Sequence, residues 1–306
     1  MIAYLSQRVL QAAGVLLGVS IITFLLAFLL PADPARMIAG RSATVATVES
    51  IREQLGLNRP LPQQYVTYLG NLLKGDFGRS YAQKADVTRI IRSRLVPTLQ
   101  LALVGILFEL LIGLPMGMIA AIKRGTWVDQ GVMAFAFVGV SAPQFVVGLL
   151  LIYFFAYLIP IFPLGGYGTA RHIVLPAIAV GLAGGGWYAR VTRSAMIDVL
   201  RQDYVRTARA KGVFPSKVVF KHVLKNAVLP VVALVGLDIG VFMGGIVIVE
   251  SVFGWPGIGQ MIWQAIQLVD IPVIMGGVLV TALFVVLGNL LADLVYPALD
   301  PRIRYS

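Results

Sequence analysis

The sequence predicts an all-α protein that crosses a membrane with six helices, and three observations lead to this prediction. First, 58% of the 306 residues are hydrophobic and only 13% are charged, a composition too apolar for a soluble chain with one core. Second, six apolar runs are long enough to cross about 30 Å of hydrocarbon. Third, these runs are longer than the strands of a membrane barrel, and helices satisfy their own backbone hydrogen bonds in lipid.

The six apolar runs follow one another along the whole chain. They cover residues 9–30, 98–122, 132–159, 173–189, 227–249 and 274–296. Pro143 lies in the third run and Pro230 lies in the fifth, and both are expected to kink their helices. The fourth run is short and contains consecutive glycines at 184–186, which allow two helices to approach closely.

The basic residues of the short loops predict that both termini lie in the cytoplasm. With the N-terminus inside, the short outer loops contain only Arg171. The basic residues that then fall on the cytoplasmic side are Arg8, Lys123, Arg124, nine Lys and Arg between 190 and 225, Arg302 and Arg304. The outer loop 31–97 carries ten basic residues, but it exceeds the length of about 60 residues to which the rule applies. The first run is too long for the apolar region of a cleaved signal peptide, so we expect it to remain as a span.

The residue types that are scarce or missing exclude several classes of function. With no cysteine, the chain has no disulfide, no Cys-ligated metal and no thiol nucleophile. The two histidines, His172 and His222, lie in an outer loop and a cytoplasmic segment and match no metal or hydrolase motif. The net charge of +11 is explained by cytoplasmic loops, and no soluble domain remains to bind nucleic acid. We therefore expect no catalytic residue, no bound cofactor, no metal and no nucleic-acid partner.

The outer loop is expected to contain amphipathic helices. Apolar residues recur at helical spacing in 48–55 and 65–73. A third segment, 87–95, sets apolar residues against three arginines directly before the second span. Such helices can lie on the bilayer with their apolar faces in the lipid. Two interpretations stay open: the helices cap the outer ends of the spans, or they form a docking floor for an external partner.

The most basic part of the chain is residues 203–230, DYVRTARAKGVFPSKVVFKHVLKNAVLP, which contains six Lys and Arg. Three lysines at 217, 221 and 225 follow the four-residue spacing of one helix stripe. Gly212 interrupts the helical pattern before them, and Phe214 and Pro215 follow it. This pattern predicts a cytoplasmic helix, a tight turn and a short helix that leads back to the membrane. A helix lying on anionic lipid would explain the charge but not the turn.

This segment resembles the cytoplasmic loop of permease subunits in binding-protein-dependent ABC importers, particularly those for dipeptides, oligopeptides, nickel and glutathione. Four more stretches are similar to the same family in the same order: LLPADPARMIAG (29–40), EQLGLNRPLPQQYVTYLGNLLKGDFG (53–78), VESVFGWPGIG (249–259) and LDPRIRY (299–305). Where the broad family has Glu-Ala-Ala, this chain has Arg206, Thr207 and Ala208, which is typical of the peptide branch. Gly212 is retained.

The resemblance implies a type I ABC importer permease fold in a bacterial or archaeal cytoplasmic membrane. The first span and outer loop would occupy 1–94, a five-span core 95–296 with a coupling loop at 190–226, and a cytoplasmic tail 297–306. The expected activity is ATP-driven import of peptide-like solutes such as di- or oligopeptides or glutathione. The expected partners are a second permease, two cytoplasmic ATPases that use ATP and Mg, an extracytoplasmic binding protein and membrane lipid. Which solute is carried, and whether the second permease is another copy, stay open.

The resemblance also implies that the short helix after Gly212 fits a groove on an ATPase. This chain has no phosphate loop of the form G-x-x-x-x-G-K-[ST] and would take its energy from that contact. Gly212 and Pro215 would shape the turn, and other residues would supply apolar contact and charge. The residues assigned to ATPase coupling are Arg206, Thr207, Ala208, Arg209, Lys211, Gly212, Val213, Phe214, Pro215 and Lys217.

Acidic residues at the spans raise a separate question. Glu109 and Asp238 are costly in hydrocarbon and indicate either the transport pathway or a partner on another helix. Asp238 could face a cationic substrate group, or it could hydrogen-bond a neighbouring helix in neutral form. The structural alternative is favoured for both. Glu250 is expected to reach water at the outer end of its span, and Trp255 to lie at the membrane interface.

The rival interpretation is an ion-coupled secondary transporter without an ATPase partner. Inverted repeats and broken helices with buried charge are typical of that class. The two halves of this sequence show no evident repeat. The large basic loop has a docking purpose only in an ABC importer, so the importer is preferred.

Overall fold

The chain forms helices joined by turns in the computed structural model, which describes residues 2–29, 33–40, 43–54, 56–244 and 246–299. Four single helices are long and apolar enough to span a membrane. They are α1 (Ile2–Leu29), α5 (Val87–Ile122), α8 (Ala170–Leu200) and α15 (Ile271–Leu299). The resemblance to LDPRIRY lies almost wholly outside the described residues.

Two further spans are broken helices. The first joins α6 (Trp127–Ser141) to α7 (Gln144–Ile152) and the π-helix η1 (Tyr153–Leu158), with a bend of 98°. The second joins α10 (Pro215–Lys217), the π-helix η2 (Val218–Val223) and α11 (Leu224–Ala227) to α12 (Leu229–Met243), with a bend of 47°. The prediction of six spans is confirmed when each bent pair is counted as one span.

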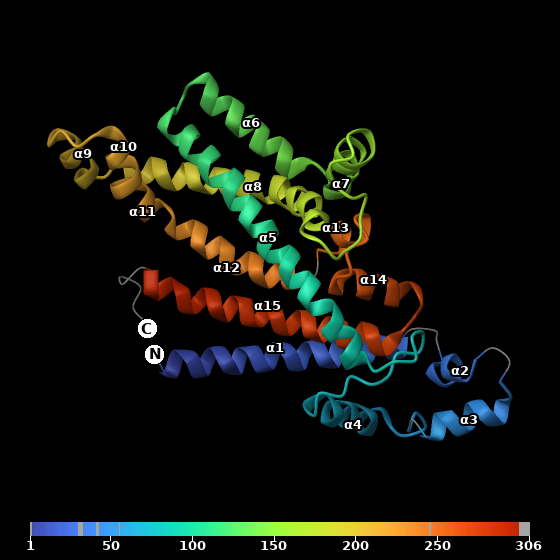
Figure 1. Ribbon diagram of the computed structural model, residues 1–306. Helices are drawn as coiled ribbons and strands as arrows, with labels where there is room; N and C mark the ends of the chain where they lie inside the picture. The colour runs from blue at the N-terminus through green and yellow to red at the C-terminus, as the bar shows by residue number, and fades with distance from the viewer. Residues whose placement is uncertain (1, 30–32, 41–42, 55, 245, 300–306) are drawn as a thin grey trace.

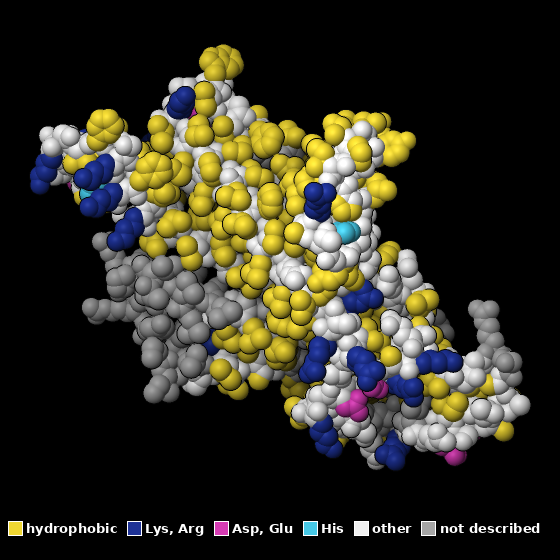
Figure 2. Space-filling model, viewed as in Figure 1, with side chains coloured by type: hydrophobic (Ala, Val, Ile, Leu, Met, Phe, Trp, Pro, Cys, Tyr) yellow, Lys and Arg dark blue, Asp and Glu magenta, His cyan; other side chains and the backbone are white. Residues whose placement is uncertain are grey.

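The remaining helices lie outside the spans. They are α2 (Pro34–Ala39), α3 (Val45–Gln54), α4 (Leu61–Leu73), α9 (Asp203–Ala210), α13 (Val247–Val252) and α14 (Ile258–Gln267). Figure 1 shows α9 and α10 at one end of the helix bundle and α2, α3 and α4 at the opposite end. On the face shown in Figure 2, hydrophobic side chains cover the region of α5, α6 and α8, while Lys and Arg gather at the two ends. This distribution fits a membrane band between two aqueous ends.

The centre of the bundle is the contact between α5 and α8, the most extensive pair of helices. Small residues allow this contact because their backbones can approach closely. A Cβ atom added at Gly117 of α5 would lie 2.5 Å from the carbonyl oxygen of Ala189 on α8. A Cβ atom at Gly105 would lie 2.9 Å from a methyl carbon of Val180. These glycines therefore set the distance between the two longest helices.

Three predicted spans differ from the observed helices. Pro143 breaks the third span instead of kinking it, because the residue before a proline disfavours helical geometry and Ala142 is extended, with ψ of 127°. The fifth helix ends at Met243, whereas the sequence predicted a span to residue 249. Pro230 lies in the first turn of α12, directly after the break at which the fifth span bends by 47°, so the kink predicted there is confirmed. The fourth helix is not short, since α8 continues through Arg190 to Leu200.

The predicted outer helices have different surroundings from one another. Residues 87–95 continue directly into α5, and Val87, Ile90 and Ile91 are buried against α14 and α15. The expectation that this apolar face lies in lipid is therefore wrong. The helices α3 and α4 have no buried residues. In α4, however, the Tyr65 ring lies 5.3 Å from Phe24 of α1, so α4 covers the outer end of the first span.

Candidate functional site

Residues 203–227 contain the predicted helix, tight turn and second helix. The helix α9 ends at Ala210, and the amide of Val213 donates to the carbonyl of Ala208 at 3.2 Å. Gly212 has φ of +70°, a left-handed conformation that favours glycine. Pro215 opens α10, where its fixed φ suits the first turn. The turn is therefore explained by two residues that the sequence pattern identified.

One face of this segment packs on the helix bundle. Val205 and Ala208 of α9 and Val218 of η2 are buried in a cluster with Ala121 of α5 and Met196 of α8. Val213 packs against the same cluster and is partly buried. Of the residues assigned to ATPase coupling, Ala208 and Val213 thus face inward and hold the segment against α5 and α8.

The opposite face of the segment is exposed. Its exposed members among the assigned residues are Arg206, Thr207, Arg209, Lys211, Gly212, Phe214, Pro215 and Lys217. Phe214 is 74% exposed, and Phe220, which lies in the same segment but is not among the assigned residues, is 62% exposed. Val218 and Val223 of η2 are buried, whereas Phe220 between them projects to the opposite side of the helix. This change of face along the helix is the sequence signal that could have identified Phe220. We call these eight residues together with Phe220 the coupling surface, an arrangement of aromatic and basic groups suited to a protein partner.

A second polar site lies where α5, α8 and α12 meet. Glu109 of α5 is 2% exposed and lies against Gly184 of α8, where any Cβ atom would overlap its carboxylate. Tyr188 of α8 donates its hydroxyl to Asp238 of α12. Both acids were predicted from the sequence, whereas Tyr188 was not, because a tyrosine in an apolar run carries no pairing signal.

The two acids differ in their hydrogen bonds. Asp238 is half-buried and has the Tyr188 hydroxyl as a partner. Glu109 is buried, and its Oε2 atom has no hydrogen-bond partner among the residues that the structure describes. A buried polar atom without a partner is costly. Tyr188 on the neighbouring helix α8 is thus the hydrogen-bond partner expected if Asp238 has a structural role. Glu109 has no such partner for its Oε2 atom among the described residues.

An ion pair between α6 and α8 was not predicted. The guanidinium of Arg193 on α8 donates to both carboxylate oxygens of Asp129 on α6, at 2.6 and 2.7 Å. The amide of Gly125 donates to the same carboxylate at 2.9 Å. Asp129 is buried, and such two-point pairing fixes both distance and orientation. The pair therefore fastens the turn between α5 and α6 to α8.

Two expectations about the outer side are wrong. Glu250 is fully buried and does not reach water: the hydroxyl of Thr98 donates to it at 2.9 Å, and the amide of Gln260 at 2.8 Å. Trp255 does not lie at a membrane interface, since it is 2% exposed and its indole nitrogen donates to the carbonyl of Pro97 at 2.9 Å. Burial raises the pKa of Glu250 above its ordinary value, although these hydrogen bonds act in the opposite direction. The segment after α13 folds back onto the start of α5, and that contact buries both side chains.

Family comparisons cover almost all of the chain. Residues 1–102 match the N-terminal model of binding-protein-dependent transport system membrane components, and residues 113–305 match the model of the inner membrane component itself. The glutathione transport system permease protein GsiC of Pectobacterium atrosepticum is 42% identical over the full length of both chains. The protein of the same name from Escherichia coli K12 is 41% identical over the same length.

Solved structures share the fold at low sequence identity. An inward-facing form of the MetNI methionine ABC transporter superposes with a TM-score of 0.59 and 20% identity, over 69% of this chain and 96% of the other. An amino acid ABC transporter crystallised with histidines gives a TM-score of 0.51 and 18% identity, over 71% of this chain and 95% of the other.

Proposed function

This chain belongs to the family of binding-protein-dependent transport system inner membrane components, and we propose that it is the permease subunit through which an ATP-driven importer moves glutathione or a short peptide. The observation that carries the choice of solute is the 42% identity to a glutathione permease over all 306 residues. It is a multi-pass membrane protein, and both termini are proposed to lie in the cytoplasm, on the same side as the coupling surface.

The coupling surface is proposed to bind a cytoplasmic ATPase. Phe214 and Phe220 offer exposed apolar groups, and the surrounding arginines and lysines offer charge for the rim of a contact. The ATPase would hold ATP and Mg, while this chain would bind neither. The importer would further contain a second permease, a second ATPase and an extracytoplasmic binding protein.

The packing of the cytoplasmic segment supports a route for the movement. Val205, Ala208 and Val218 are close-packed on the cytoplasmic ends of α5 and α8. Close-packed side chains transmit displacement because they cannot be compressed. Movement of the coupling surface with an ATPase would therefore move α5 and α8 together, since their backbones are in close contact at the glycines. This is how ATP binding at a partner would open the pathway to the other side.

The roles of Glu109 and Asp238 in the transport pathway stay predictions. The Oε2 atom of Glu109 has no hydrogen-bond partner among the described residues. This favours a role in the pathway, in which a polar group of the solute would bind this atom during transport. The hydrogen bond from Tyr188 favours a structural role for Asp238.

The direct test is gentle purification of the tagged chain from its native membrane, followed by mass spectrometry of the associated proteins. We expect a second permease and one or two P-loop ATPases. Reconstituted with the binding protein, the complex should import radiolabelled glutathione or dipeptide only with ATP. A chain recovered alone, and active in proteoliposomes without ATP, would identify a secondary transporter and overturn the proposal.

A further inference from the structure

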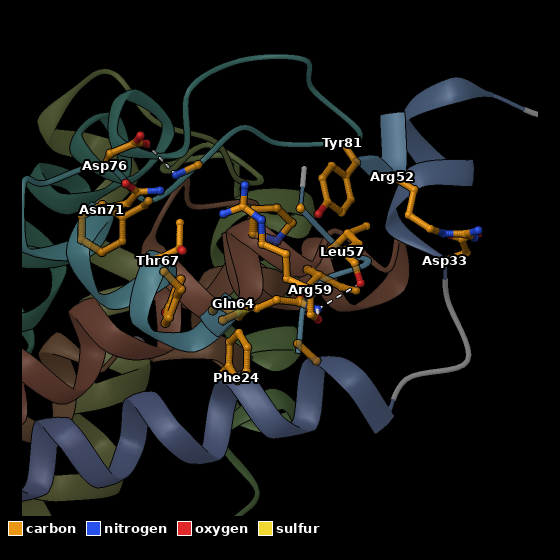
Figure 3. Close-up of a pocket in the computed structure, with 18 residues that line it drawn as sticks. Phe24, Asp33, Arg52, Leu57, Arg59, Gln64, Thr67, Asn71, Asp76 and Tyr81 are labelled. Atoms are coloured by element: carbon orange, nitrogen blue, oxygen red, sulfur yellow. Dashed lines mark hydrogen bonds and ion pairs between the residues drawn. The ribbon is translucent and has the colours of Figure 1, made fainter. Parts of the chain in front are cut away.

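A cavity of about 400 Å³ lies at the outer end of the molecule, between α1, α4 and the start of α15. One side of it is apolar and is formed by Phe24, Ala27 and Met275. The other side is polar and includes Arg59, Thr67 and Asp76. Figure 3 shows Phe24 next to α1, and Asn71 and Asp76 on the far side of the cavity from it. The cavity is thus divided into an apolar part near the spans and a polar part away from them.

A second cavity of about 460 Å³ lies directly beside the first, between α1 and α15. Its lining is apolar except for Thr23, whose hydroxyl donates to the carbonyl of Val19 in its own helix. Ala27, Ile271 and Met275 line both cavities. Because α1 and α15 are both candidate spans, we expect this groove to lie at the depth of the hydrocarbon. The two cavities are therefore neighbours, one apolar and the other polar at its outer end.

The aromatic residues place the polar end at the membrane surface. Tyr65 and Tyr68 of α4 cluster with Phe24 of α1, and Tyr81 lines the first cavity. Tyrosine is enriched at the level of the lipid headgroups. Burial, with the carboxylate of Asp270 beside it, raises the pKa of Tyr81 to about 12, so its hydroxyl remains a neutral hydrogen-bond donor.

The charged side chains in the polar part of the first cavity differ in their ion pairs. Arg52 is paired with Asp33 at 2.5 Å and with Glu49 at 2.8 Å. Arg59 forms no ion pair with any residue that the structure describes. Asp76 accepts a hydrogen bond from the amide of Gly78 and is otherwise exposed. Among the described residues, the site thus offers one guanidinium without an ion pair and one accessible carboxylate.

We propose that the two neighbouring cavities hold one outer-leaflet phospholipid with an amine headgroup. The acyl chain lies in the groove between α1 and α15, the phosphate binds Arg59, and the ammonium group faces Asp76. A phosphate needs a cationic donor and an ammonium group needs a carboxylate, and the polar end supplies both. A water-soluble zwitterion would match the charges but would leave the apolar groove empty. The lipid would fill the space between α1 and α15 and hold the outer helices against the membrane. This binding would not require an ATPase.

The test is to reconstitute the purified assembly containing the full chain in nanodiscs of equal parts dioleoyl phosphatidylethanolamine and dioleoyl phosphatidylglycerol. After release into mild detergent, native mass spectrometry counts the lipids that each chain retains. We expect one retained phosphatidylethanolamine. Arg59→Gln should lower the retained fraction about fivefold, which corresponds to about 1 kcal/mol for one basic side chain at a lipid surface. Arg59→Lys should restore most of it.

A second variant tests the groove. Ala27→Phe places a ring at the junction of the two cavities and should also reduce retention. The matched controls lie outside the site: Arg92→Gln on α5 and Leu10→Phe on α1, both exposed positions, should retain the lipid like the wild type. Equal retention in the site variants and the controls would overturn the proposal. Displacement of the lipid by millimolar diglycine would instead identify a soluble zwitterion as the occupant and would overturn it as well.

Discussion

Two short segments of this chain each combine glycine, an aromatic residue and proline, yet they have opposite surroundings. Residues 212–215 read GVFP between α9 and α10, and residues 254–257 read GWPG between α13 and α14. Both begin with a glycine of positive φ, +70° and +60°. Yet Phe214 is 74% exposed, whereas Trp255 is 2% exposed.

The difference shows that a turn motif determines the direction of the backbone but not the burial of its aromatic residue. Trp255 is covered by the start of α5, which supplies the Pro97 carbonyl for its indole, and by the Tyr167 ring at 4.9 Å. Phenylalanine has no polar group to pair, and Phe214 has no such cover in the described part of the chain. One aromatic stabilises the fold, and the other remains available for a partner.

The largest effect on stability is expected from Trp255→Ala. Removing a fully buried tryptophan should cost about 3–5 kcal/mol, because the cavity it leaves adds to the lost apolar burial. Thermal melting in nanodiscs would measure this loss. Trp127→Ala is the matched control, since Trp127 is 88% exposed and its removal should cost less than about 0.5 kcal/mol. Equal melting temperatures for the two variants would contradict the burial of Trp255.

The next largest effect is expected from Glu250→Ala. This change leaves the Thr98 hydroxyl and the Gln260 amide without their acceptor, at a cost of about 1–3 kcal/mol for a buried unpaired group. The exposed Glu53→Ala on α3 serves as the control and should melt like the wild type. If both variants melted alike, the buried hydrogen bonds of Glu250 would contribute nothing.

The same residue predicts a pH dependence. Because burial raises the pKa of Glu250, the folded chain binds this proton more tightly than the unfolded chain. The stabilisation from this group is therefore complete below the ordinary value of 4.5 and is lost as the pH rises through the raised value. Glu250→Gln should flatten this part of the stability profile, which melting curves over a pH series would show. A profile as steep as that of the wild type would assign the dependence to other groups.

A small effect on stability with a large effect on transport is expected from Phe214→Ala and Phe220→Ala. Each exposed change should alter stability by less than about 0.5 kcal/mol. As aromatic anchors of a contact, each should weaken ATPase binding by about 2 kcal/mol or more and reduce uptake accordingly. Phe137→Ala on α6, 65% exposed and far from the coupling surface in the sequence, is the control. Normal recovery of the ATPase and normal uptake in both variants would contradict the proposal that the coupling surface binds the ATPase.

Asp238→Asn is also expected to have only a small effect on stability. An interhelical hydrogen bond within a membrane contributes about 0.6 kcal/mol on average, and asparagine still accepts from Tyr188. If Asp238 instead contacts the amino group of a substrate, uptake of peptides with a free amino terminus should fall while that of N-acetylated peptides stays constant. Equal loss for both kinds of peptide would leave Asp238 with its structural role alone.

Much of the cytoplasmic site could be predicted and little of the outer one. Gly212 and Pro215 are local signals, and the helix, turn and helix around them follow from backbone preferences of neighbouring residues. The sequence did not reveal the roles of Tyr188, Phe220 and Arg193. These roles depend on which residues or partners face them in the folded protein. Glu250 was assigned to water because its sequence neighbours mark the end of an apolar run, although Thr98, far earlier in the chain, covers it.

The sequence by itself determined the membrane class, the number of spans, the basic cytoplasmic turn and the family, because apolar run length and turn residues act through short stretches of chain. Only the tertiary structure decided that α8 is the long central helix, that Pro143 breaks its span, and that Glu250 and Trp255 are buried. It also decided which acids meet which partners. The physical reason is that burial and pairing are properties of two segments brought together, such as α5 with residues 250–260, and neither segment carries that information alone.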